Sequence, residues 1–202
     1  MRKGFFTRKV DTLLGVDIND TTIRLVQLGC SASGYNVQAY VTQALPAHTV
    51  VDSTLLDLDG VGRALRSALS RLSTSARGAA AAVAGPSVIT RMIQMEADQY
   101  IPYPLDDVAI DFQVRGPSAL DPGRIEVLLA ACLKEQVEAR ETVLALAGLV
   151  PRVVDVEAFA LARACSQDFA SFTPSDRVDG AQWAVDAQGM GVACGLALRS
   201  FA

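Results

Sequence analysis

The first 85 residues carry four strand-like runs, and a helical segment separates the last run from the other three. The first three runs, residues 13–17, 22–28 and 35–41, follow one another through short turns and predict an antiparallel meander. The fourth run, residues 79–83, reads AAAAV and is apolar throughout, which is typical of a buried parallel strand. Because a strand that returns through a crossover helix pairs in parallel, this order predicts an α/β fold.

The segment between the third and fourth runs has the pattern of an amphipathic helix. Either Asp57 or Asp59 can cap its start. The apolar residues that fall on one face of this predicted helix are Val61, Ala64, Leu65, Ala68, Leu69 and Leu72.

A second group of strand signals indicates a small sheet of its own. Its runs are residues 87–95, 108–114 and 125–132, and the loop GPSALDPG joins the last two. A helix is then expected from about residue 134 to 147, ending at Gly148, with Pro151 shortly beyond.

That helix has a polar side, which we expect to face solvent and which consists of Glu135, Glu138, Arg140 and Glu141. Residues 152–156 predict another strand and residues 157–165 the start of another helix.

The two ends of the chain give weaker signals. Residues 1–10 are basic with two phenylalanines, and they indicate a disordered tail or a contact with a membrane surface. Residues 166–180 show no periodic pattern and predict a linker. The closing stretch GMGVACGLALRSFA fits a packed helix or strand and is too short to span a bilayer.

Composition excludes several classes of function. A net charge of −4 argues against a nucleic-acid-binding protein, which would need a basic face. The four cysteines are widely spaced and His48 is the only histidine, so neither a zinc site nor a Ser-His-Asp triad is expected. With no export signal, we expect reduced thiols in the cytoplasm.

Several stretches resemble known proteins. GVDINDTTIRLVQL is similar to the opening hairpin of actin-like ATPases. The PilM family of type IV pilus assembly proteins is resembled by AVAGPSVITRMIQM, EADQYIPYPLDDVAIDFQVRGPS, VLLAACLKEQVEAR, GLVPRVVDVEAFALARA and VACGLALRSF. The resemblance implies an α/β, actin-like (ribonuclease H-like) subdomain, related to the division protein FtsA, with an inserted strand–helix–strand–strand (SHS2-like) module.

The resemblance also implies a domain layout. The expected parts are a flexible tail (1–11), an actin-like subdomain (12–85 with 150–165 and 186–202), the inserted module (86–149) and a linker (166–185). In the family a second actin-like half stands where residues 166–185 lie here. This chain therefore reads as an internally shortened version, natural or engineered, and its uncovered apolar faces would favour self-association.

PilM-like proteins are expected in the cytoplasm at the inner membrane, where they capture the N-terminal tail of PilN, a single-span membrane protein. The resemblance implies a PilN-like partner, other pilus platform proteins and a scaffold that performs no catalysis. The alternatives are an actin-like ATP-binding protein or ATPase and an FtsA-like division tether.

One stretch of the module is a candidate partner-binding ledge. Pro102 and Pro104 fix an extended backbone, on which Tyr100, Ile101 and Tyr103 would border a peptide groove. The alternative is a stiff connector whose tyrosines pack inward.

A candidate phosphate site consists of Asp17, Thr21 and Arg24, which match the hairpin of actin-like enzymes by position. Asp20 argues against it, because a carboxylate repels phosphate. The alternative is a structural turn in which Asp20 and Thr21 bond their own backbone. We therefore expect no required cofactor, although ATP and magnesium belong to the full-length family. The stretch VDAQGMG, residues 185–191, is too loosely spaced to predict a second phosphate loop.

Overall fold

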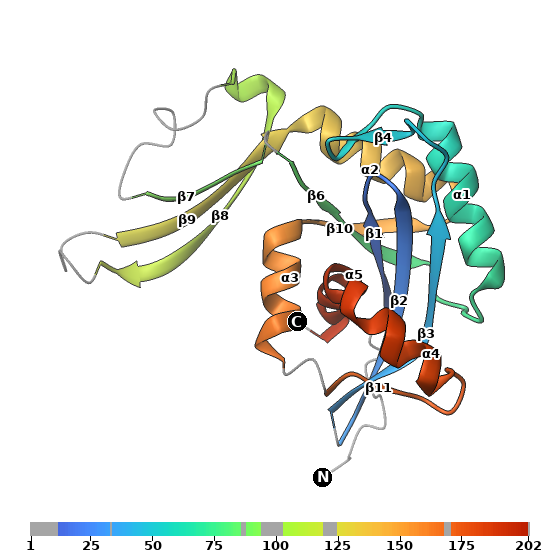
Figure 1. Cartoon of the computed structure of the whole chain (residues 1–202). Coiled ribbons are helices and arrows are strands. Elements are labelled where there is room, and N and C mark those ends of the chain that lie inside the picture. The colour runs from blue at the N-terminus through green and yellow to red at the C-terminus, as the bar shows by residue number, and fades with distance from the viewer. Residues whose placement is uncertain are drawn as a thin grey trace, which may run out of the picture.

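Two β-sheets organise the computed structural model, which describes residues 12–32, 34–85, 88–93, 103–118, 125–167 and 171–201 (Figure 1). The larger sheet has six strands in the order β10-β6-β1-β2-β3-β11. Their bounds are β1 Leu13–Ile18, β2 Thr22–Ser31, β3 Gly34–Ala44, β6 Gly78–Val83, β10 Val150–Val156 and β11 Thr173–Pro174.

The pairing of this sheet confirms the predicted meander and the predicted parallel strand. β1 pairs antiparallel with β2, and β2 pairs antiparallel with β3. β6 returns parallel to β1, and β10 adds in parallel on the far side of β6. The carboxyl ends of the parallel strands β1, β6 and β10 therefore lie at the same end of the sheet.

Helices α1 (Leu58–Arg71) and α2 (Lys134–Leu146) cover one face of this sheet. Asp57, one of the two predicted caps, accepts a 2.8 Å hydrogen bond from the Gly60 amide at the start of α1. Gly148 follows α2 with a φ of 83°, the left-handed conformation that favours glycine at a helix end.

The prediction that Arg140 lies on the solvent side of α2 is wrong, because its side chain is only 1% exposed. Its guanidinium donates to the carbonyl oxygens of Ala82 at 3.1 Å and Ser53 at 2.6 Å. Arg140 thus ties α2 to the end of β6 and to a short hairpin formed by β4 (Val50–Val51) and β5 (Thr54–Leu55). The sequence did not indicate this hairpin.

The opposite face of the large sheet is covered by α3 (Glu157–Ser166) and α5 (Gly191–Ala197), as Figure 1 shows. The closing stretch therefore forms a packed helix, one of the two predicted outcomes. A 3-10 turn, η5 (Leu198–Phe201), follows α5.

Residues 171–189 differ from the patternless linker that the sequence indicated. β11 pairs in parallel with β3, and Phe172 just before it is 2% exposed. The helix α4 (Gly180–Asp186) and the 3-10 turn η4 (Ala187–Gly189) follow, and Trp183 of α4 is buried. Its Nε1 donates to the Phe172 carbonyl, and its ring meets Tyr40 edge-on. This segment is docked onto the sheet.

The three-stranded sheet of the expected module has the order β7-β9-β8. Its strands are β7 (Ile89–Ile93), β8 (Val108–Pro117) and β9 (Ile125–Leu133), all antiparallel, with a short 3-10 turn η2 (Leu105–Asp107) before β8. The predicted separate sheet is confirmed. β8 lies at its edge, next to the large sheet's own edge strand β10 (Figure 1).

Candidate functional site

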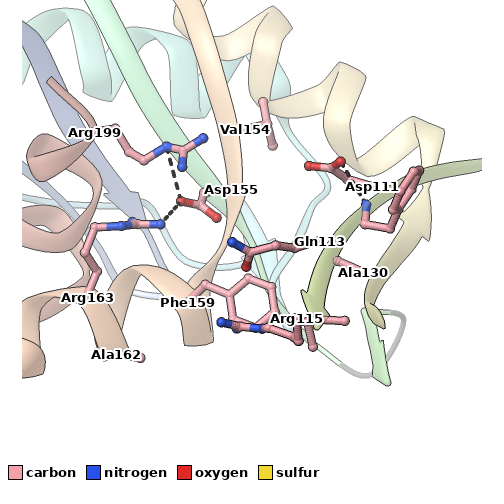
Figure 2. A pocket seen from close by; sticks show the side chains of 12 residues that line it. Asp111, Gln113, Arg115, Ala130, Val154, Asp155, Phe159, Ala162, Arg163 and Arg199 are labelled. Carbon is pink, nitrogen blue, oxygen red and sulfur yellow. Dashed lines mark hydrogen bonds and ion pairs between the residues drawn. The ribbon is translucent and has the colours of Figure 1, made fainter. Parts of the chain in front are cut away.

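A cavity of about 510 Å³ lies between the two sheets. One wall comes from β8 and β9 of the small sheet. The other comes from β10, α3 and η5 of the main body. Figure 2 shows the labelled side chains, and the full lining is Asp111, Phe112, Gln113, Arg115, Leu128, Ala130, Val154, Asp155, Phe159, Ala162, Arg163 and Arg199.

The main-body wall holds a charged cluster. The Asp155 carboxylate accepts a 2.9 Å hydrogen bond from Arg163 and lies 3.8 Å from Arg199 Nε. Arg163 also donates to the Gly195 carbonyl. These bonds fix β10, α3 and the C-terminal elements to one another, and Asp155 is neutralised by two cations.

The side chains on the small-sheet wall make fewer interactions with one another than those on the main-body wall. Arg115 of β8 forms no ion pair with any residue in the described part of the chain. Phe112, on the same strand, is 66% exposed although it lines the cavity. The lining as a whole therefore offers exposed apolar surface together with an excess of arginine over aspartate.

A second cavity of about 170 Å³ adjoins the first and shares Asp111, Ala130, Val154 and Asp155 with it. It continues past the buried residue Cys132, whose thiol has a pKa raised by burial. The shared lining makes one groove that follows β8, and its inner end is mostly apolar.

The structure describes only two residues of the predicted ledge, Tyr103 and Pro104. Tyr100, Ile101 and Pro102 fall outside the residues that the structure describes. Tyr103 packs inward against the cluster of Val108, Leu129 and Ala131, as in the alternative that the sequence left open. Pro104 precedes the 3-10 turn before β8, and neither Tyr103 nor Pro104 lines the cavity.

The candidate phosphate site brings two of its three residues together. Asp17 and Arg24 are paired in the β1–β2 register, and their side chains form a 3.2 Å ion pair. Burial raises the pKa of the Asp17 carboxyl to about 6, against the opposing effect of Arg24, and the nearby Glu157 raises it further. The cost of desolvation therefore outweighs the attraction of the single arginine.

The turn between β1 and β2 is held by a residue that the sequence did not single out. Asn19 Oδ1 accepts hydrogen bonds from the backbone amides of Thr21 at 3.1 Å and Thr22 at 2.9 Å. Asp20 instead reaches the Asp52 and Ser53 amides in the β4–β5 turn, both residues with positive φ. Asn19 therefore makes the backbone bonds that the structural alternative assigned to Asp20 and Thr21.

The stretch 185–191 spans the end of α4, the turn η4 and the start of α5. Gly189 lies against Arg24, since a Cβ built on Gly189 would stand 3.3 Å from Arg24 Nε. Within the described ranges, no group of three or more His, Cys, Asp or Glu side chains could hold a metal ion. None of the helices described there is long and apolar enough to cross a bilayer.

Sequence reasoning missed the residues that line the groove. Phe112 falls on the apolar phase of the alternating run VAIDFQV, so the pattern predicts burial for it. Arg163 and Arg199 come from elements that are far apart in the sequence, and no local pattern joins them to β8. The alternation does place Asp111 and Gln113 on one face of β8, the only signal for this wall.

Comparisons with known proteins agree with this architecture. Residues 15–169 match the family model described as type IV pilus assembly protein PilM. The chain is also similar to a chain of a solved PilM-PilN type IV pilus biogenesis complex, with a TM-score of 0.69 and 24% identity. That alignment covers 79% of this chain and 51% of the other, so this chain spans about half of its length.

Two further solved structures are more distant. One is the cytoplasmic domain of EpsL, an inner membrane component of the type II secretion system of Vibrio cholerae, at TM-score 0.47 and 14% identity, covering 73% and 58% of the two chains. The other is the ethanolamine utilization protein EutJ from Carboxydothermus hydrogenoformans, at TM-score 0.43 and 21% identity, covering 76% and 39%.

Proposed function

Because this chain belongs to the family of the type IV pilus assembly protein PilM, we propose that it binds the N-terminal cytoplasmic tail of a PilN-like inner-membrane protein. In this role it is a scaffold at the cytoplasmic face of the membrane, and it connects that protein to other components of the pilus platform. The binding site is the groove between the small sheet and the main body.

The observation that carries this proposal is the groove itself. It has the form of a peptide site, because exposed Phe112 and half-buried Phe159 offer apolar contact area, while Arg115 and Arg199 give polar anchoring points. A cavity of about 510 Å³ falls within the ~300–1,000 Å³ that ligand sites commonly occupy.

The test is a calorimetric titration with a synthetic peptide of the cytoplasmic tail of the PilN-like protein from the same organism. We expect saturable one-to-one binding. Phe159→Ala removes apolar surface from the main-body wall and should weaken the binding. A matched control is Leu161→Ala on the same helix, since Leu161 is exposed and does not line the groove. An absence of binding to the unmodified chain would contradict the proposal.

We also propose that the scaffold works without ATP hydrolysis. Two amides of the β1–β2 turn, those of Thr21 and Thr22, are bonded to Asn19, and the same turn carries the Asp20 carboxylate, which accepts from the Asp52 amide. A phosphate group would have to displace these bonds and approach a negative charge. Thermal unfolding with and without Mg-ATP tests this: we expect the same midpoint, and a nucleotide-dependent rise would support the ATP-binding alternative.

A further inference from the structure

The edge of β8 that faces away from β9 carries a backbone amide whose one partner among the described residues is the side chain of its neighbour. The Phe112 N–H donates to Oδ1 of Asp111 at 2.8 Å. β8 pairs with β9 on one side, and no other described strand pairs with it. An amide that donates to an adjacent side chain points away from the paired strand. Because the groups alternate in an antiparallel ladder, the amides of Ile110 and Val114 point the same way.

Asp111 acts as a temporary cap on this edge. It is exposed, lines the groove and forms no ion pair with a described residue. Charged side chains at sheet edges are a common way to keep an unpaired strand from joining another chain. The local bond is easy to exchange, because an exposed carboxylate loses little when water replaces its partner.

The opposite wall shows a similar bond in a fixed form. The Val156 amide at the end of β10 donates to Asp155 at 2.8 Å. That carboxylate is also held by Arg163 and Arg199, so it is not free to move aside. Of the two strand edges beside the groove, β8 is therefore the one whose amide can be released.

The side chains around this edge determine which chemical groups a complementary added strand needs. Phe112 offers apolar contact, and Arg115 on the same cavity wall is a cation that forms no ion pair with a described residue. A complementary strand has a carbonyl oxygen opposite the Phe112 amide, an apolar side chain over Phe112 and a carboxylate near Arg115.

We propose that the partner tail adds as a further strand to the edge of β8 that no described strand covers, displacing Asp111 from the Phe112 amide, and that an acidic residue of the tail pairs with Arg115. This inference rests on the proposed function, because it names how the same groove takes its peptide. The tail then runs along residues 110–114, where outward amides recur about every 7 Å.

The main test is a set of synthetic tail peptides, each with one N-methylated backbone amide, titrated into the unmodified chain. A strand uses every second main-chain group toward its partner, so methylation should weaken binding at alternate positions only. We expect a loss of about three- to tenfold at each sensitive position, the range for one main-chain hydrogen bond. Sensitivity without alternation would overturn the inference.

A second test acts on the protein. Phe112→Pro removes the outward amide and the aromatic ring, whereas Phe112→Ala removes the ring alone. A proline whose missing N–H points to solvent is compatible with an edge strand. We expect Phe112→Pro to bind the tail about three- to tenfold more weakly than Phe112→Ala. Equal affinities of two folded variants would overturn the inference.

Hydrogen exchange followed by NMR removes the dependence on either variant. On addition of the unmodified tail peptide, exchange at the Ile110, Phe112 and Val114 amides should slow. By the alternation of the ladder, the intervening amides face the paired strand β9 and should change little. If the tail binds and these three amides exchange as before, strand addition is wrong while the proposed function stands. If the tail does not bind at all, both fail.

Discussion

Gly15 of β1 and Ala193 of α5 lie in direct backbone contact. A Cβ built on Gly15 would stand 1.9 Å from the Ala193 carbonyl oxygen, far inside van der Waals contact. Gly195, two residues further along α5, meets the Ala160 carbonyl of α3 in the same way at 1.8 Å. The two glycines let the C-terminal helix sit between the sheet and α3 without side chains in between, which brings Arg163 and Arg199 to the groove.

Alanine at either of these glycines should therefore destabilise the fold. For Gly15→Ala and Gly195→Ala we expect a loss of at least about 1–3 kcal/mol in the free energy of unfolding, because the clashing atoms belong to backbone that cannot move alone. Gly180→Ala is the matched control, since its Cβ would meet only Pro174 at an ordinary 3.5 Å. Urea denaturation measures all three, and a loss as large in Gly180→Ala would contradict the close-contact explanation.

Most of the fold could be predicted from the sequence, and the predictions that failed did so for physical reasons. The strand runs and α1 are amphipathic or apolar over their whole length, so periodicity identified them, and the actin-like α/β fold is confirmed. The prediction for Arg140 was wrong because helical spacing cannot show that the carbonyl oxygens of Ala82 and Ser53 accept hydrogen bonds from its buried guanidinium. The β4–β5 hairpin was not predicted because each of its strands has only two residues, too few to show an alternating pattern.

The buried carboxyl of Asp17 should make stability fall as the pH rises. Its folded pKa is raised from 3.8 to about 6, so the folded state binds the proton more tightly than the unfolded state does. The contribution of this group is most favourable below about pH 4, declines between about pH 4 and 6, and costs about 3 kcal/mol above that window. Chemical denaturation across this range measures the trend.

The variant Asp17→Asn tests the assignment of this trend to one residue. Asparagine does not ionise, so this part of the pH dependence should disappear and the variant should gain stability at neutral pH relative to the unmodified chain. Glu138→Gln on the exposed side of α2 serves as the control and should leave the pH profile unchanged. Retention of the full decline in Asp17→Asn would show that another group is responsible.

Arg115 should control how the affinity for the tail depends on salt. It forms no ion pair within the described ranges, so it can attract an acidic residue of the tail, and such an attraction at an exposed site is screened by salt. We expect Arg115→Gln to weaken binding by roughly two- to fivefold at low ionic strength and to flatten the salt dependence. Arg152→Gln on β10 lies outside the groove lining and should preserve both values.

The groove was only partly predictable because it is assembled by tertiary structure. Asp111 and Phe112 belong to one predicted strand, yet Phe159 and Arg199 reach the site only when α3 and η5 dock on the large sheet. The tyrosine–proline stretch was predicted as the binding site because the stiffness that its prolines impose can be recognised in the sequence alone. Tyr103 shows what that stiffness does within the described residues, since it fixes the entry to β8 by packing inward.

Trp183 should report whether residues 171–189 are docked or loose. Its side chain is buried, donates to the Phe172 carbonyl and packs edge-on against Tyr40, whose hydroxyl donates to Asp186 at 2.9 Å. As the only tryptophan of the chain, it should emit at shorter wavelength than free tryptophan and be protected from acrylamide quenching. Both properties should be lost in one step with global unfolding, because the segment shares a core with β2 and α5.

Removal of the Trp183 side chain measures how much the docking of residues 171–189 contributes to the free energy of unfolding. Trp183→Ala should cost about 3–5 kcal/mol in the free energy of unfolding, the range for a buried aromatic truncated to alanine. Val185→Ala on the same helix is the control and should stay within about 0.5 kcal/mol, because Val185 is 75% exposed. If Trp183→Ala unfolded at the same denaturant concentration as Val185→Ala, the segment would be a linker, as its sequence suggested, and the cover that it gives to Tyr40 and Arg24 would not exist in solution.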